Sequence, residues 1–211
     1  MPNYIVQYEK TGNAKYISHL DFLRTFNRVL RRSKIEIAYS QGFNPHPLLS
    51  FALPLSVGVT SECEILEMTL TKERSREEII TMLNRVMPEG IRVLNAYPSE
   101  GKFAKHIRYA TYVVHAMPHP GKQAIDALLK MPEILMDKKT KSGIKECDIR
   151  PDIKEILWTP EHITMTISAG SQANLKPDLV MQALSRYTDY NVDDFECHRV
   201  HILNGEGQVM V

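Results

Sequence analysis

The sequence has few cysteines, and those it has are widely spaced. Only three occur among 211 residues, at positions 63, 147 and 197. A disulfide framework is therefore not expected, and reduced thiols in the cytoplasm are the simpler interpretation. Neither a CxxC pair nor a CxxxCxxC triplet is present, so an iron–sulfur cluster held by this chain alone is not expected. No cysteine and histidine stand at zinc-finger spacing, and we expect neither a metal nor a cofactor.

Other signatures are missing as well. No run of about 18 apolar residues exists, so a membrane span is not expected. The opening MPNYIVQYEK lacks a basic segment followed by an apolar one, which argues against a secretory signal and favours the cytoplasm. The motifs GxxxxGK[ST], GxGxxG and GxSxG are all absent, so the sequence predicts neither a nucleotide-binding loop nor a serine hydrolase elbow.

The overall charge is also uninformative. Lysine and arginine total 26 against 25 aspartate and glutamate, for a net charge of +1, so any electrostatic signal must be local. The 43% hydrophobic and 24% charged content is typical of globular proteins. The length fits one large domain or two domains of about 100 residues each.

The first half of the chain alternates strand-like and helix-like patterns. Strands are predicted at residues 4–8, 48–53, 62–70 and 91–96, and helices at 19–33 and 75–87. This β-α-β-β-α-β order is that of a ferredoxin-like unit.

The second half has a similar but less regular order. Strands are predicted at residues 109–116, 134–136, 145–157, 162–168 and 198–203, and helices at 121–130 and 177–187. We therefore predict an α+β fold of two tandem ferredoxin-like units with antiparallel sheets, residues 1–98 and 99–211. No residue-by-residue repeat supports the duplication, which rests on element order alone.

The predicted helix at 19–33 has two distinct faces. Ser18 is a good N-cap, and Phe22, Leu23, Phe26, Val29 and Leu30 form a core-facing stripe. The opposite face carries four arginines: Arg24, Arg28, Arg31 and Arg32. Together with Lys15, Lys34 and the single acidic residue, Asp21, they give residues 15–34 a local charge of +5. Planar bidentate donors suit phosphate oxygens, so the face predicts phosphate binding. The alternative is a solvated face neutralised by glutamates nearby.

The segment YSQGFNPHPLLS at residues 39–50 is the second candidate. Its aromatic, amide and imidazole groups can stack on bases and bond to their edges, as single-stranded RNA recognition requires. Gly42 allows a positive φ, and two prolines limit the entropy lost on ordering. The alternative is a rigid connection, and for Phe43 alone we expect packing in the core.

Two histidines are candidates for catalysis. The N-terminus of the predicted helix disfavours protonation of His19, and a neutral imidazole there could act as a general base in RNA cleavage. His46, between two prolines, is the other candidate. A structural role remains open for both.

A third basic segment is KKTKSGIK at residues 138–145. Its lysines flank a turn and predict a hairpin tip that reaches a phosphate backbone, with Lys139 and Lys141 as the contacts. A charged, solubilising loop is the alternative.

Several stretches resemble a known family. ISHLDFLR (17–24), YSQGFNPHP (39–47), FALPLSVG (51–58), residues 145–151 and NLKP (174–177) are similar to the radical-SAM-linked protein family. Members of that family are fused to, or encoded beside, cobalamin-binding radical SAM proteins. The resemblance implies a radical SAM partner in trans and a link to RNA processing or ribosome biology, but no catalytic mechanism.

Together these patterns predict an RNA-binding, substrate-presenting partner of a radical SAM enzyme, in tRNA or rRNA modification or processing. The alternative is a metal-independent endonuclease using a histidine, by analogy with tandem ferredoxin-like RNA endonucleases that process CRISPR transcripts. The oligomeric state stays open. The residues expected to bind nucleic acid are Lys15, Arg24, Arg28, Arg31, Arg32, Tyr39, Gln41, Phe43, Asn44, His46, Lys139 and Lys141.

Overall fold

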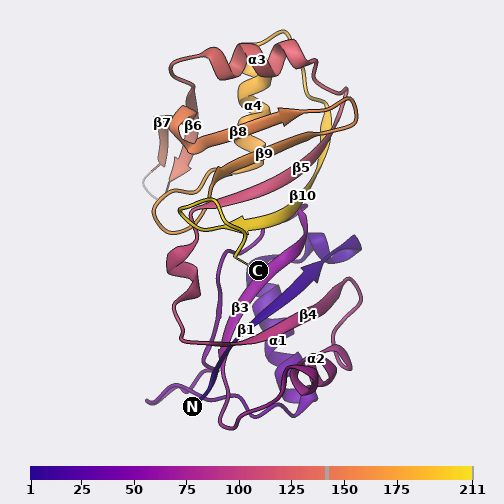
Figure 1. Ribbon diagram of the computed structural model, residues 1–211, viewed down its shortest axis with the longest axis vertical. Coiled ribbons are helices and arrows are strands. Elements are labelled where there is room, and N and C mark those ends of the chain that lie inside the picture. Colours follow the sequence, from indigo (N-terminus) through magenta and orange to yellow (C-terminus); the bar gives the residue numbers. More distant parts are fainter. Residues whose placement is uncertain (141–142, 211) are drawn as a thin grey trace. The chain divides into compact units, whose positions relative to one another are not determined.

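The computed structural model describes residues 1–140 and 143–210, and the chain forms two compact units (Figure 1). One comprises Met1–Ile107 and the other Arg108–Met210. The sequence predicted the boundary between the two units at residues 98 and 99. The division falls later because strand β4 runs to Ser99 and a short 3-10 helix, Phe103–His106, precedes the next strand. Both units combine helices with antiparallel strands, which confirms the α+β class.

The first unit contains a four-stranded antiparallel sheet. Its strands are β1 (Asn3–Lys10), β2 (Leu49–Phe51), β3 (Thr60–Thr69) and β4 (Ile91–Ser99), in the order β4-β1-β3-β2. Asn3 lies opposite both Thr69 of β3 and Ser99 of β4. Because side chains alternate along a strand, this register fixes which residues share each face of the sheet.

Two helices cover one face of this sheet. Helix α1 spans His19–Ser33, as the periodicity predicted, and the Ser18 side chain caps it by accepting the Asp21 N–H. Helix α2 (Arg76–Asn84) begins with a Ser75–Glu78 capping box. It ends three residues earlier than predicted because the Asn84 side chain bonds both the N–H and the C=O of Val93.

The core of this unit lies between the sheet and the helices. Tyr4, Val6 and Tyr8 of β1 are buried against Phe22 and Phe26 of α1. The Phe51 ring of β2 packs at centroid distances of 5.2 and 5.9 Å from Phe22 and Phe26. Residues of β1 and β3 that alternate with these core residues therefore lie on the opposite face of the sheet.

The second unit has the same kinds of element with an added hairpin. Its elements are β5 (Tyr109–Met117), α3 (Lys122–Lys130), β6 (Leu135–Thr140), β7 (Gly143–Asp148), β8 (Ile153–Trp158), β9 (Ile163–Ser168), α4 (Pro177–Tyr187) and β10 (Asp194–Leu203). The main strands are ordered β10-β5-β9-β8, while β6 and β7 pair with each other in a separate two-stranded sheet. Pro177 opens α4 at a position where its missing N–H costs nothing. Among the described residues, no helix has both the length and the apolar character needed to cross a bilayer.

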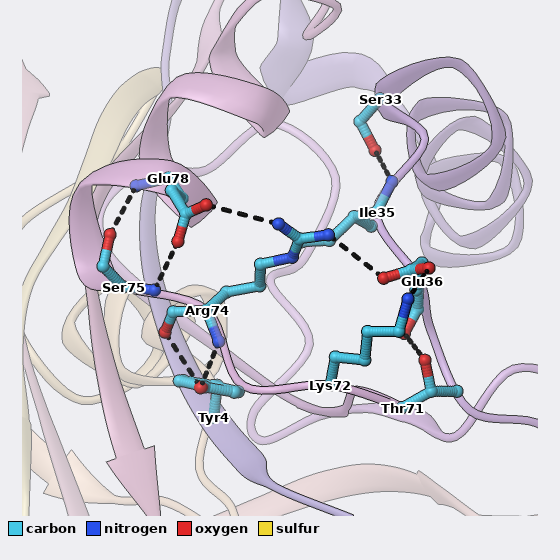
Figure 2. A network of polar contacts seen from close by, with 9 residues as sticks. All are labelled: Tyr4, Ser33, Ile35, Glu36, Thr71, Lys72, Arg74, Ser75 and Glu78. Carbon is cyan, nitrogen blue, oxygen red and sulfur yellow. Dashed lines mark hydrogen bonds and ion pairs between the residues drawn. The ribbon is translucent and has the colours of Figure 1, made fainter.

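A polar network ties the segment after α1 to the start of α2 (Figure 2). Arg74 bonds Glu36 at 3.0 Å and Glu78 at 3.2 Å, while the Tyr4 hydroxyl donates to the Arg74 C=O and accepts its N–H. Hydrogen bonds from Lys72 and Arg74 hold the pKa of Glu36 below its ordinary value. This network fixes where the chain leaves α1, and therefore where the following loop starts.

Candidate nucleic-acid interface

The arginine face of α1, formed by Arg24, Arg28, Arg31 and Arg32, is exposed. Arg24 pairs with Asp21 at 3.1 Å. Hydrogen bonds to the Asp21 carboxylate, the stronger from the Ser18 hydroxyl and the weaker from Arg24, lower the pKa of Asp21. Within residues 1–140 and 143–210, Arg28, Arg31 and Arg32 have no ion pair or hydrogen bond through their side chains. Three guanidinium groups are thus available to an external anion.

Lys15 and His19, near the start of α1, are less suited to binding a ligand. Lys15 is half-buried, with its ammonium 5.4 Å from the Tyr16 ring centroid. His19 is exposed, and its ring meets the Phe51 ring edge-on at 5.7 Å. The cavity that His19 lines with Glu64 has a volume of about 10 Å³. A cavity of that size holds at most one water molecule, so this cavity is too small for a substrate.

The loop of residues 40–46 is closed at its base by its own first and last residues. The Ser40 hydroxyl lies 2.9 Å from His46 Nδ1 and accepts the His46 N–H at 3.1 Å, while the Ser40 N–H donates to the His46 C=O at 2.9 Å. Tyr39 forms a β-bridge with Pro47 directly below. Gly42 has φ 125°, a conformation open to glycine, which allows the turn. The loop is therefore a braced projection, which extends from the first unit (Figure 1).

The tip of this loop faces solvent. The relative exposure of Phe43 is 105%, and Gln41, Asn44 and His46 are exposed, as is Tyr39 at the base. The expectation that Phe43 packs in the core is wrong. The segment instead closes on itself through Ser40 and His46 and holds Phe43 at a tip that faces solvent. Both faces of the Phe43 ring are therefore accessible to a binding partner.

The lysines of the β6–β7 hairpin are only partly described. Lys138 donates from its ammonium to the Asn174 carbonyl at 2.8 Å, so it contributes to the fold of the second unit. Of Lys139 only the backbone, in β6, is described, and Lys141 lies outside the described residues. The hairpin itself forms, with Lys138 opposite Lys145.

A groove beneath the loop was not foreseen from the sequence. It has a volume of about 320 Å³, and its lining includes Asn3, His46, Ser50, Glu67 and Thr69. Asn3, Ser50, Glu67 and Thr69 alternate with core residues along their strands, so they lie on the sheet face opposite the helices. The alternation of β3 could have indicated that Glu67 and Thr69 share a face. Nothing in the sequence indicated that strands β1 and β2 place Asn3 and Ser50 beside Glu67 and Thr69.

The structure therefore does not place all the candidate residues on one face. The arginine face of α1 is on the outer side of the helix layer, and the groove lined by His46 is on the other side of the sheet. The loop rises from β2, the edge strand between these two sides. In the part of the chain that the structure describes, no group of three or more His, Cys, Asp and Glu residues could hold a metal ion.

Comparison with known proteins gives a family but no activity. The chain is similar to a chain in "Crystal Structure of a Cbf5-Nop10-Gar1 Complex", with 9% identity and a TM-score of 0.49, over 94% of this chain and 48% of that chain. It thus spans about half the length of that protein. A second similar structure, an unknown protein from Galdieria sulphuraria, has 12% identity and a TM-score of 0.28, over 94% and 98% of the two chains. Neither similarity supports an argument about function, and no curated protein matches the chain. A family model matches residues 3–177, most of the sequence, and the chain therefore belongs to the family described as an uncharacterized protein conserved in bacteria (DUF2344).

Proposed function

We propose that this protein binds RNA and presents it to a radical SAM enzyme, in tRNA or rRNA modification or processing. The observation that carries the proposal is the braced loop with Phe43 fully exposed at its tip. Leaving such a side chain in water forgoes about 1.5–3 kcal/mol of burial. Stacking of a base on an aromatic ring is worth about 1–3 kcal/mol, so RNA binding offsets that cost.

The bracing of the loop favours the same function. A loop that is already ordered loses little conformational entropy when it binds. The Ser40–His46 hydrogen bonds and the prolines at positions 45 and 47 supply that order before any ligand arrives. Asn44 and Gln41, both exposed beside Phe43, offer amide groups to base edges.

The arginine face supplies phosphate contacts. Residues 34–39 connect α1 to the loop, and six residues span at most about 21 Å. One RNA strand can therefore contact Phe43 and the C-terminal arginines, Arg31 and Arg32, by passing around the β2 edge of the sheet. In this arrangement the arginines contribute affinity and the loop contributes selectivity.

The proposal of a radical SAM partner rests on the sequence resemblance of residues 17–24, 39–47 and 51–58.

We also propose that both units are ferredoxin-like. Each main sheet places its first strand between its fourth and its third, with the second at the edge: β4-β1-β3-β2 and β10-β5-β9-β8. The β6–β7 hairpin is then an insertion between the first helix and the second strand of the second unit.

Incubation of the purified protein with total tRNA and rRNA tests the function. We expect retarded RNA in native gels and intact RNA in denaturing gels. Phe43→Ala should weaken the retardation, while Leu157→Ala, which removes an exposed apolar side chain of the second unit, should not. Absence of any complex at low salt would overturn the proposal.

A second candidate function, RNA cleavage by a histidine, has one observation in its favour. Ser40 orients the His46 ring through Nδ1, and Nε2 has no partner in the described residues. In the tautomer that carries its proton on Nδ1, Nε2 can act as a general base. If the wild-type protein cleaves RNA and His46→Ala does not, with Ser40→Ala as the comparison, the function is RNA cleavage and not RNA presentation.

A further inference from the structure

The groove beneath the loop has the size and lining of a small-molecule site. Its volume of about 320 Å³ is near the lower end of the range for ligand pockets, about 300–1,000 Å³, so it suits a single ring system. The floor is part of the sheet face opposite the helices, formed by Asn3, Ser50 and Glu67. Gly101, which has no side chain, and His46 border it.

Asn3 presents a hydrogen-bond donor at this floor. The Thr69 hydroxyl donates to Asn3 Oδ1 at 2.7 Å, which fixes the orientation of the amide. The Nδ2 group is then the free end of the side chain, and it has no partner within the described residues. A Cβ on Gly101 would stand 3.9 Å from that nitrogen, so glycine keeps the approach to Asn3 open.

Glu67 presents an acceptor nearby. The Phe103 N–H donates to Oε1 at 2.9 Å and holds the carboxylate in place, while Oε2 has no hydrogen bond in the described part of the chain. Asn3 lies opposite Thr69, and Glu67 is two residues away on the same face. Diagonal neighbours of this kind are about 7–8 Å apart, a spacing that leaves room for the edge of a heterocycle between donor and acceptor.

We propose that the groove binds one unpaired nucleobase that carries an exocyclic amino group, namely cytosine, adenine or guanine. The amino group donates to Glu67, and Asn3 Nδ2 donates to a ring nitrogen or carbonyl oxygen of the same base. Uracil has no amino group, and its single donor, N3–H, bonds the carboxylate less strongly because the second carbonyl oxygen beside N3–H repels it. The inference rests on the proposed RNA binding, and it supplies the selectivity that stacking on Phe43 lacks.

The position of His46 links the base in the groove to the base stacked on Phe43. It belongs both to the groove lining and to the closed base of the loop that carries Phe43. A strand with one base on Phe43 therefore brings a neighbouring base to the groove. Free nucleoside monophosphates share the base chemistry, and the experiment separates these two sources.

The test uses the full chain and a short fluorescein-labelled oligouridine whose central position is uridine, cytidine, adenosine or guanosine. Fluorescence anisotropy should show that each amino-bearing oligonucleotide binds about tenfold more tightly than the all-uridine one, as expected for one hydrogen bond to a charged group. Glu67→Gln should abolish this preference, because its amide oxygen still accepts the Phe103 N–H while its NH2 group cannot accept a hydrogen bond from the base. The control Glu89→Gln removes an exposed carboxylate outside the groove and should behave as wild type.

A second variant protects the test against misfolding. Asn3→Asp keeps the acceptor for Thr69 but replaces the donor with a carboxylate oxygen, so it should also lose the preference. Equal binding of all four oligonucleotides, or an unchanged preference in both variants, would overturn the groove inference while RNA binding stands. If no oligonucleotide binds but cytidine or guanosine monophosphate does, and Glu67→Gln abolishes this, the groove inference holds and the proposed function fails. Binding of neither ligand would overturn both.

Discussion

Ser40 and His46 hold the base of the exposed loop with three hydrogen bonds to each other. Two use the Ser40 hydroxyl, at 2.9 Å to Nδ1 and 3.1 Å to the His46 N–H, and the third joins the Ser40 N–H to the His46 C=O at 2.9 Å. The hydroxyl is therefore the one side-chain group that joins both the backbone and the imidazole. It orders the projection before a ligand binds.

Replacement of Ser40 by alanine removes two of these three bonds. We expect a loss of about 1–3 kcal/mol in the free energy of urea-induced unfolding, since each of the two hydrogen bonds contributes about 0.5–1.5 kcal/mol net. RNA affinity should fall as well, because an unbraced loop must be ordered on binding. Ser40→Thr, which keeps the hydroxyl, should restore both. A Ser40→Ala protein with wild-type affinity would show that the bracing has no role in binding.

The arginines should govern the salt dependence of RNA binding. The slope of log affinity against log salt is about 0.7 per phosphate contacted on a single strand, so Arg31→Ala/Arg32→Ala should lower it by about 1.4. The melting temperature should stay nearly unchanged because both side chains are exposed and unpaired within the described residues. Arg85→Ala, which removes an exposed arginine at the end of α2, is the matched control. A slope equal to that of wild type would exclude these arginines as phosphate contacts.

Phe43 should affect binding without supporting the fold. Phe43→Ala removes a stacking surface and should weaken oligonucleotide binding by about 1–3 kcal/mol, while Phe43→Trp should retain it. Urea unfolding should be unchanged in both variants because the ring is fully exposed. A marked loss of stability in Phe43→Ala would instead indicate that the ring packs against the protein.

The network around Arg74 should weaken in acid. Hydrogen bonds from Lys72 and Arg74 lower the pKa of Glu36 below its ordinary 4.5, and the Ser75 N–H and Arg74 lower that of Glu78. A carboxyl with a lowered pKa stabilises the fold above its unfolded pKa, and this contribution disappears as pH falls below about 4.5 and through the folded value. Glu36→Gln should therefore lose less thermal stability than wild type between neutral pH and pH values below 4.5. Parallel melting curves for the two proteins would contradict this assignment.

The three cysteines should differ in reactivity. Burial raises the pKa of the Cys197 thiol to about 12, so almost no thiolate forms near neutral pH. Cys63 is also buried, whereas Cys147 is partly exposed. A thiol reagent applied to the folded protein should modify Cys147 first, as peptide mass mapping would show. Equally rapid modification of Cys197 would indicate that β10 opens in solution.

Local patterns in the sequence were enough to predict much of the fold. The apolar stripe and the Ser18 cap specified α1 as His19–Ser33, and Pro177 marked the start of α4. Both depend on neighbours within a few residues of one another, so they can be read without knowledge of the rest of the chain. The exposure of the arginines followed in the same way, because it is the opposite side of a helix whose core stripe is clear.

The exposure of Phe43 and the groove depended on contacts that are distant in sequence. A phenylalanine is most often a core residue, and its exposure here became visible only with the loop that Ser40 and His46 close. Asn3 and Glu67 are 64 positions apart and come together because β1 pairs with β3 in one particular register. A shift of that register by one residue would turn Glu67 into the core, so the sequence determined the helix and its charges, and the tertiary structure alone decided the groove.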